Sequence, residues 1–526
     1  MKKFPKLLAL LLALLLVLPT AVACAENTPA GGNDQTTDAQ DTDTPDALVN
    51  TLNGAPLSEY TIIYSESGLD FNKRAAEYIG SAIEAVTGTA PAVKLDTETE
   101  ATDKEILVGI TNRQEALAIE GGVEGATEGF EFLTASKDTK VLLYGEEYMI
   151  AGAAYAFAKN LAENTAVTVP AEVTVGTPVF EDANNFIYVI SDGMGFNTLN
   201  FGYDLYVKGT HTEHEDISGY PQDIVANRFP HKAQNYTHSL NDDVTDSAAG
   251  GTALATGYKT YNGVVGLNGD YKEIQNLSEL AISLGKKTGV LTTDEINGAT
   301  PAAFSVHTDS RDNTEEILSA QEESGIDIVI GDITDPATIF RKSLEALKND
   351  DKGFFVMYEE AYTDKGSHDN NSEVVYNAYT RLNTALRIAF EFVLYNPDTV
   401  LILTADHETG GITYDEEKGS YKFTSGDHTQ VNVPFYGIGK GTEVIDGKTY
   451  DTVCVMDIES GGCGVISEQF LDKNGRTILW RRFNRNDWAI DRYKQPWTEL
   501  LPDNERITVN GTTYVHWYDC ITDYIL

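Results

Sequence analysis

The chain has 526 residues, which is too long for one ordinary hydrophobic core, so we expect two or more domains. Hydrophobic residues make up 41% of it, as is typical of a globular protein. The formal net charge of −43 argues against nucleic acid as a partner and against general electrostatic binding to anionic membranes.

The first 24 residues have the pattern of a bacterial export signal. Three lysines within the first six residues precede an apolar run, 7–18, which is too short to span a membrane comfortably. Small residues then precede Cys24, as in a lipobox. We therefore expect residues 1–24 to be a lipoprotein-type signal peptide that exports the chain and anchors it to the cell surface through a lipid on Cys24. Cleavage nearby, with release of the protein, is the alternative.

Residues 25–47 are rich in Asp, Thr, Gly, Asn and Pro and cannot bury enough apolar area to fold, which predicts a flexible linker. Residues 48–178 then predict a small α/β domain without a cluster of catalytic residue types, so we expect a structural or binding role. Its strand and turn at 105–113 and its helix at 150–161 resemble the accessory domain of some secreted carbohydrate-active enzymes. The other predicted elements are strands at 60–64 and 140–144 and a helix at 72–86.

From residue 185 onward, continuous apolar strands alternate with helices. This pattern indicates an α/β domain with a mostly parallel sheet sandwiched by helices. Ligands of such sheets gather at the carboxyl ends of the strands. The predicted strands are 186–190, 288–293, 327–331, 353–357 and 399–404, and the predicted helices are 276–284, 314–323, 338–348 and 374–393.

Acids and histidines follow several of these apolar runs. One acid after a strand is usually a helix cap, but here several share one edge of the sheet with three of the nine histidines. Carboxylates mixed with imidazoles suit Zn²⁺, whereas a set of oxygen ligands alone suits Mg²⁺. The residues concerned are Asp192, Glu359, Asp364, His368, Asp406, His407 and His428.

Ser247 lies in the stretch TDSAAGGTAL, residues 245–254. The small residues after it allow a helix start to approach an anion closely, with its free N–H groups facing the ligand. No partner histidine is evident nearby in the sequence, so a metal is the better candidate for activating a serine nucleophile. The alternative is that Asp246 or Ser247 only caps the helix. The local sequence leaves both interpretations open.

Residues from about 185 to 440 resemble the metal-dependent alkaline phosphatases of bacteria and animals. Each motif alone is weak, but together, in the family's order and with compatible spacings, they are highly specific. The matching motifs are Asp192-Gly-Met-Gly, 245–249 through 256–257, 299–303 with Arg311, Glu359 with Asp364 and His368, 404–411, and 425–428.

This resemblance implies a phosphatase that hydrolyses small-molecule phosphate monoesters through a phosphoserine, with two zinc ions and one magnesium ion. Ser247 would be the nucleophile, and Arg311 would grip two phosphate oxygens in a bidentate fork. The implied ligands are Asp364, His368 and His428 for one zinc; Asp192, Asp406 and His407 for the second zinc, which would ionise Ser247; and Asp192, Thr300 and Glu359 for magnesium. A homodimer is among the oligomeric states that we keep open.

Three positions bear on this comparison. Gly298 stands two residues before Thr300, where the family commonly has Asp or His, which leaves the affinity of the magnesium site open. Lys365 matches some bacterial members. Glu360 stands where glycine is frequent, and either adds a negative charge near the site or points outward.

After residue 441 the resemblance fades. Turn signals and aromatic-rich strands predict a β-rich insertion at about 444–513, for which a structural cap is the preferred role, and a final helix at 518–525. At most one disulfide can form among Cys454, Cys463 and Cys520.

Two other functions stay open. A phosphodiesterase on the same fold differs only in loops that set substrate size. A lipoprotein that binds phosphate or a glycan without catalysis is disfavoured by the complete ligand set. A sulfatase is disfavoured because the residues after Ser247 lack the Pro-x-Arg context.

Overall fold

The computed structural model describes residues 50–113, 130–208, 224–348 and 351–447, together with short strands between 449 and 514. The chain divides into two compact units between Thr177 and Pro178. The predicted signal peptide, the linker at 25–47, the helix at 518–525, and Cys24, Cys463 and Cys520 lie outside the described residues.

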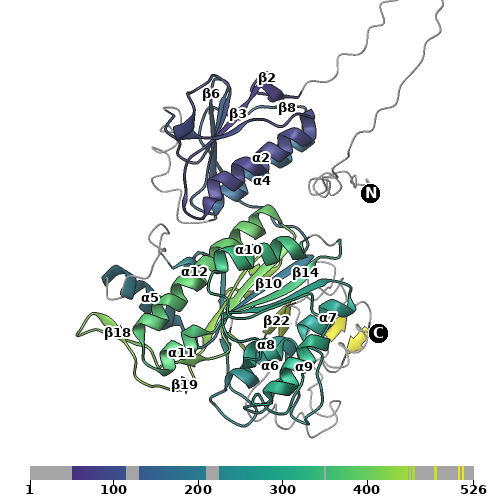
Figure 1. Ribbon diagram of the computed structural model, residues 1–526, viewed down its shortest axis with the longest axis vertical. Helices are drawn as coiled ribbons and strands as arrows, with labels where there is room; N and C mark the ends of the chain where they lie inside the picture. Colours follow the sequence, from purple (N-terminus) through teal and green to yellow (C-terminus); the bar gives the residue numbers. More distant parts are fainter. Residues whose placement is uncertain are drawn as a thin grey trace, which may run out of the picture. The chain divides into compact units, whose positions relative to one another are not determined.

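The first unit is an α/β fold whose six-stranded sheet has the order β4-β3-β5-β7-β6-β9. Two helices, α2 (Phe71–Thr87) and α4 (Met149–Glu163), pack against each other and against the sheet (Figure 1). Helix α2 ends at Gly88, whose φ of 74° is the left-handed conformation that glycine favours at this position. The strands are β3 (Thr61–Tyr64), β4 (Val93–Leu95), β5 (Glu105–Val108), β6 (Phe132–Lys137), β7 (Lys140–Tyr144) and β9 (Thr174–Gly176).

The second unit is built on an eight-stranded sheet of order β13-β12-β14-β10-β15-β20-β11-β21. Only β20 runs against its neighbours, so the predicted mostly parallel sheet is confirmed. Its strands are β10 (Asn185–Ser191), β11 (His231–Tyr236), β12 (Lys287–Thr292), β13 (Ile328–Ile330), β14 (Phe354–Glu360), β15 (Thr399–Thr404), β20 (Val433–Ile438) and β21 (Thr449–Asp451).

Helices cover both faces of this sheet, as predicted (Figure 1). The main apolar core lies between the sheet and the group of α6 to α9, where Tyr188 of β10 meets Phe304 edge-on. On one face lie α5 (Phe196–Lys208), α10 (Pro336–Leu347) and α12 (Ser372–Tyr395); on the other lie α6 (Ser247–Thr256), α7 (Leu277–Ser283), α8 (Ala299–Ala303) and α9 (Thr314–Glu323).

The strand register brings polar residues together at one edge of the sheet. Ile190 pairs with Glu359 on one side and with Thr404 on the other, so the segments after β10, β14 and β15 emerge side by side. The turn after β10 contains Gly193, whose φ is 74°. A Cβ atom there would lie 2.7 Å from the Cα of Asp364, so this close approach requires glycine.

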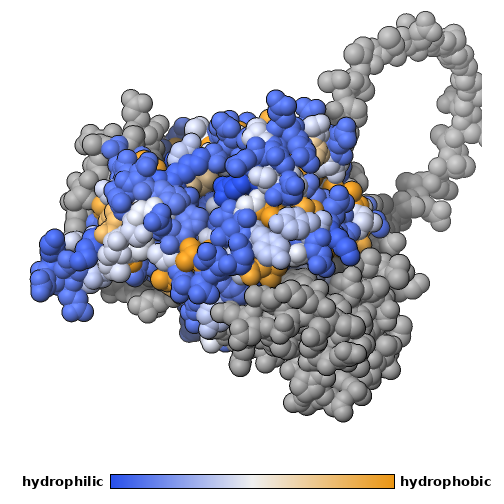
Figure 2. Space-filling model, turned by 90° about the horizontal axis from the view of Figure 1, so that it is seen from below, coloured by the Kyte–Doolittle hydropathy of each residue, from blue (hydrophilic) through white to orange (hydrophobic). Residues whose placement is uncertain are grey.

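Short antiparallel pairs lie in the span for which a β-rich insertion is expected: β22 (Val453–Val455) with β23 (Leu479–Arg481), and β24 (Ile507–Val509) with β25 (Thr512–Tyr514). The face in Figure 2 is mostly hydrophilic, with apolar side chains only in small groups. Among the residues that the structure describes, none of the helices has both the length and the apolar character needed to cross a membrane.

Candidate active site

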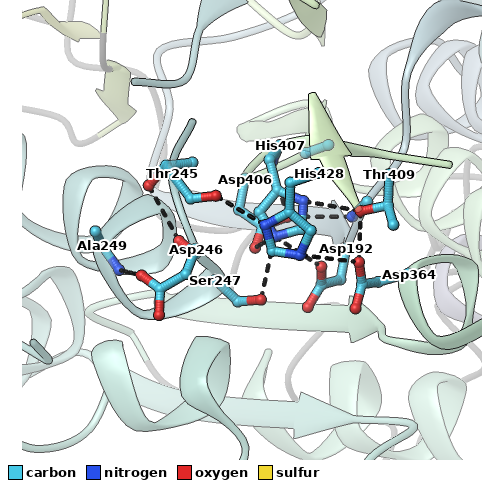
Figure 3. Close-up of polar contacts among 12 residues, drawn as sticks. Asp192, Thr245, Asp246, Ser247, Ala249, Asp364, Asp406, His407, Thr409 and His428 are labelled. Atoms are coloured by element: carbon cyan, nitrogen blue, oxygen red, sulfur yellow. Dashed lines mark hydrogen bonds and ion pairs between the residues drawn. The ribbon is translucent and has the colours of Figure 1, made fainter. Parts of the chain in front are cut away.

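Ser247 is the first residue of α6, and its hydroxyl oxygen lies 3.1 Å from Nε2 of His407 (Figure 3). Asp246 is the helix cap, because its Oδ1 accepts a hydrogen bond from the backbone N–H of Ala249 at 3.0 Å. Glycine is needed at position 250, in the first turn of α6, since a Cβ there would lie 2.9 Å from the backbone oxygen of Asp406. Asp246, rather than Ser247, therefore caps α6. The small residues after Ser247 allow the start of the helix to lie close to the segment that contains Asp406 and His407.

A first group of donor atoms surrounds Nε2 of His407. This nitrogen lies 3.3 Å from Oδ2 of Asp406 and 3.5 Å from Oδ1 of Asp192. Both oxygens are buried and have no hydrogen-bond partner. Bonds of about 2.0–2.1 Å to zinc would separate the ligand atoms of a tetrahedron by roughly 3.3–3.4 Å. The two buried oxygens without partners and their distances from Nε2 of His407 therefore suit ligands of a zinc ion, with Ser247 also beside this nitrogen.

A second group comprises Asp364, His368 and His428. The two imidazole Nε2 atoms are 3.0 Å apart and lie 3.4 and 3.5 Å from Oδ1 of Asp364. Each Nδ1 atom donates to a backbone oxygen, that of Gly426 for His368 and that of Thr245 for His428, at 2.7 and 2.8 Å. Both Nε2 lone pairs are therefore directed into the group, as metal ligation requires.

The two groups are contiguous. The rings of His407 and His428 stack with their centroids 3.6 Å apart. Asp364 also lies close enough to Asp192 and His407 for one oxygen or nitrogen of each to surround a single ion. Two cations in such neighbouring groups could clamp the attacking and leaving oxygens of a displacement at phosphorus.

A third set offers oxygen atoms only. Glu359 at the end of β14 accepts a hydrogen bond from the hydroxyl of Thr292 on β12, and Thr300 on α8 is buried nearby. The charge of Glu359 also acts on Asp192, which bridges to the first group. This set of oxygens suits magnesium rather than zinc.

Three acids of the cluster are too deeply buried to ionise freely in the absence of a cation. Burial raises the pKa of Glu359 to about 8. Burial, followed by the charges of Asp406, Asp364 and Glu359, raises the pKa of Asp192 well above its ordinary value. Burial also raises the pKa of Asp406. Bound cations would offset the repulsion and let the carboxylates ionise.

His407 is neutral in this environment. Burial lowers the pKa of its imidazole to about 3. The hydroxyl of Thr409 donates to Oδ1 of Asp364 at 2.5 Å and therefore accepts from Nδ1 of His407 at 3.1 Å. Nε2 of His407 is thus the unprotonated nitrogen that faces Ser247.

Arg311 lies beside the nucleophile end of the cluster. Its Nη1 donates to Oδ2 of Asp246 at 3.1 Å, and its side chain is 38% exposed, so other N–H groups can bind an anion. The structure thus brings all of the predicted site residues to one edge of the sheet. It adds Thr292 and Thr409, which the sequence analysis did not single out. Thr409 ends the short strand β16 (Glu408–Thr409), which begins directly after His407, and a spacing of two in extended chain places both side chains on one side.

The structure shows what surrounds Gly298 and Glu360, the two positions at which the sequence departs from the family's usual residues. Lys365 forms an ion pair with Asp294, and a Cβ at Gly298 would lie 3.2 Å from an oxygen of that same carboxylate. Asp294 therefore fills the space beside Gly298. Glu360 is fully buried in a bidentate pair with Arg381, at 2.8 and 2.6 Å. The alternative that Glu360 points outward is therefore wrong, and the negative charge that it brings beside Glu359 is paired with Arg381.

The fold and this site define an α/β protein with a cluster of candidate metal-ligand atoms beside a buried serine. A family model described as "Alkaline phosphatase" matches residues 183–337 and 334–459, which together exceed half of the chain. The chain therefore belongs to the alkaline phosphatase family.

Individual relatives match parts of the chain. Alkaline phosphatase 4 of Bacillus subtilis is 26% identical over 294 residues, covering 44% of this chain and 63% of the relative. The Escherichia coli alkaline phosphatase is 37% identical over 129 residues, covering 24% of this chain and 26% of that protein. The solved alkaline phosphatase of the Antarctic bacterium TAB5 is 25% identical and has a TM-score of 0.46. The match covers 52% of this chain and 95% of the TAB5 chain. This chain spans less than two thirds of the length of these curated relatives.

Proposed function

We propose that this protein is a phosphatase that hydrolyses phosphate monoesters through a covalent phosphoserine on Ser247. The observation that carries the proposal is the 3.1 Å approach of the Ser247 hydroxyl to Nε2 of His407 within a cluster of metal-ligand atoms. A serine hydroxyl needs a base or a metal to become nucleophilic. With a pKa of about 3, His407 is a poor base, which favours activation by a metal.

Two zinc ions and one magnesium ion complete the proposal. The proposed ligands are Asp364, His368 and His428 for one zinc, Asp192, Asp406 and His407 for the other, and Asp192, Thr300 and Glu359 for magnesium. When bound, these cations would lower the pKa of the serine hydroxyl, neutralise the leaving oxygen and activate water.

The side chains of this protein have distinct parts in the reaction. The Ser247 hydroxyl gives up its proton to solvent, and its oxygen attacks phosphorus at the amino end of α6, where free N–H groups and the helix dipole favour a negative charge. The bond from phosphorus to the ester oxygen breaks, and that oxygen leaves with the electron pair and takes a proton from solvent. Arg311 holds two non-bridging oxygens. Water then cleaves the phosphoserine, releasing inorganic phosphate and restoring Ser247.

Kinetics of Ser247→Ala test the proposal. We expect turnover of p-nitrophenyl phosphate to fall by roughly a thousandfold or more, because the covalent route is lost. Ser283→Ala serves as the matched control, since the Ser283 hydroxyl binds the backbone oxygen of Leu280 within α7. Full activity in Ser247→Ala would overturn the proposal. Faster cleavage of bis-p-nitrophenyl phosphate than of the monoester would show instead a phosphodiesterase.

We propose further that the chain is exported and tethered by a lipid on Cys24, on the basis of the charged start, the short apolar run and the small residues before Cys24. Labelled fatty acid should be incorporated by cells that express the full chain, and Cys24→Ala should abolish the labelling. Incorporation that persists in Cys24→Ala would contradict the tether.

A further inference from the structure

A cavity of about 810 Å³ lies beside the second donor group. Its walls come from α5, from the strand β18 (Ser420–Lys422), from the loop that follows it, and from the start of α12. Pockets for small organic ligands usually measure about 300–1,000 Å³. The side chains and loop residues that matter for the argument are Phe201, Leu205, Tyr421, Phe423, Ser425 and Gly426.

The cavity wall and the second donor group share a backbone segment. The oxygen of Gly426, which lines the cavity, accepts the Nδ1–H bond of His368 at 2.7 Å. The N–H groups of Thr424 and Ser425 both donate to the oxygen of Gly410 at 3.0 Å, which fixes this loop to the segment after His407. The cavity therefore has a fixed position relative to the metal-ligand atoms.

The cavity lies on the side of the cluster from which the leaving oxygen of the proposed reaction would depart. Ser247 lies at one end of the cluster and Asp364 at the other, with His407 and His428 between them (Figure 3). In an in-line displacement the leaving oxygen departs on the side opposite the nucleophile. That side is the one held by Asp364, His368 and His428, and the residues that support His368 line the cavity.

The lining favours a flat, uncharged group. Phe201 and Phe423 meet edge to face with centroids 5.2 Å apart, and Tyr421 packs against the same buried cluster. The charge of Asp204 in the wall disfavours an anion, and Lys422 is paired with Asp415 at 2.9 Å. An aromatic ring can stack on Tyr421 and Phe423, which are only partly buried, whereas a second phosphate group would meet repulsion.

We propose that this cavity binds the organic part of the phosphate ester and selects leaving alcohols that carry an aromatic ring. The proposal rests on the phosphatase function proposed above. A nucleobase and an aryl group share the chemistry that the cavity recognises, so separate substrate pairs are needed to distinguish them.

Two matched pairs of esters test the proposal. Adenosine 5′-monophosphate and ribose 5-phosphate have the same type of leaving oxygen and differ by the base; 2-naphthyl and phenyl phosphate differ by one ring. We expect kcat/KM for the larger member to exceed that for the smaller one by roughly tenfold in at least one pair, as stacking on an aromatic side chain typically gives. A preference in only one pair identifies the base or the aryl group as the ligand.

Substitutions of cavity residues test whether the cavity causes the preference for the larger ester. Phe423→Ala and Tyr421→Ala should each reduce the ratio of the two kcat/KM values toward one. Tyr236→Ala, which removes a half-exposed ring of β11 outside the cavity, should keep the wild-type ratio. Equal kcat/KM values within both pairs in the wild-type protein, or a ratio unchanged in both cavity variants, would overturn the inference.

Binding separates this inference from the proposed function. If none of the esters is hydrolysed, the phosphatase proposal fails, but saturable binding of 2-naphthol can still be followed by its fluorescence. Binding that Phe423→Ala weakens would support the cavity as an aromatic site. Absence of binding to the wild-type protein would overturn it.

Discussion

Oδ2 of Asp246 accepts a hydrogen bond from Nη1 of Arg311 at 3.1 Å, while its Oδ1 accepts the N–H of Ala249. One carboxylate therefore fixes both the start of the helix that carries Ser247 and the guanidinium beside it. Residues 65 positions apart in the chain are thereby held at one place in the site. The contact orients Arg311 through a single nitrogen and leaves its remaining donors for an anion.

Replacement of Asp246 should separate the helix cap at Oδ1 from the contacts of Oδ2, which accepts the backbone N–H of Gly263 at 3.0 Å as well as the Arg311 guanidinium. Asp246→Asn keeps the acceptor for Ala249 and should be more stable than Asp246→Ala. Asp246→Ala removes the cap and should lower the free energy of unfolding by about 1 kcal/mol. Urea denaturation of the metal-free protein measures both changes. Equal stabilities of the two variants would show that the cap contributes nothing.

Arg311→Lys should weaken the binding of the substrate rather than unfold the protein. A lysine keeps the charge but cannot make the bidentate contact, so kcat/KM for p-nitrophenyl phosphate should fall roughly ten- to a hundredfold, mainly through KM. The inhibition constant of inorganic phosphate should rise in parallel. Arg341→Lys, which changes a pair with Glu391 on α10 and α12, is the matched control. An unchanged KM in Arg311→Lys would exclude a role in binding phosphate.

Much of the fold could be predicted from sequence because its central strands are continuously apolar and its helices have clear ends. The predicted end of β14 was wrong because the strand contains buried charged residues. The sequence predicted that one strand would end at Met357, but β14 continues through Glu359 and Glu360. Acidic residues indicate a strand end in a sequence pattern, whereas here Arg381 compensates Glu360 within the protein.

The contents of the candidate site could be predicted, but its contacts could not. Residue types at strand ends indicated carboxylates and imidazoles at one edge of the sheet. The approach of His407 to Ser247 depends on the pairing of segments 160 positions apart, which no local pattern encodes. Asp294 and Gly298, by contrast, are near neighbours in the sequence, and their approach depends on the conformation of the turn between β12 and α8, which residue types alone do not specify.

Metal affinity should rise with pH. The pKa of Glu359 is about 8 in the metal-free protein, and burial also raises those of Asp192 and Asp406, so a cation must displace protons. Affinity should increase roughly tenfold per pH unit for each displaced proton, and the part due to Glu359 should level off above about pH 8. Calorimetry in buffers of different ionisation enthalpy measures the released protons. Affinity independent of pH, without proton release, would contradict this.

The same acids should make the metal-free protein less stable as pH rises. A carboxyl group whose pKa is raised in the folded state from 4.5 to about 8 stabilises that state fully below pH 4.5. This contribution is lost as the pH rises through about 8. After chelation, the melting temperature should therefore fall across this interval, and the increase on adding zinc and magnesium should be largest near pH 8. A metal-induced increase that is largest at low pH would contradict the assignment of these acids.

Asp294 should compensate for the glycine at position 298. Its carboxylate neutralises Lys365, whose ammonium also lies 4.9 Å from the ring centroid of Tyr362. In Asp294→Ala this positive charge is unpaired near the site, so inorganic phosphate should inhibit more strongly, by roughly two- to fivefold, the range expected for a partly exposed ion pair. Phosphate inhibition constants measured at low and high salt should show the change mainly at low salt.

A rescue variant makes this assignment specific. The double variant Asp294→Ala/Gly298→Asp should return the inhibition constant toward the wild-type value, because the new carboxylate would enter the space that Asp294 vacates. In a Lys365→Met background, Asp294→Ala should have little effect, since the charge that Asp294 neutralises is already gone. The same increase in inhibition with and without Lys365 would mean that Asp294 acts on the site by another route. In that case the ion pair would not explain how this chain tolerates Gly298.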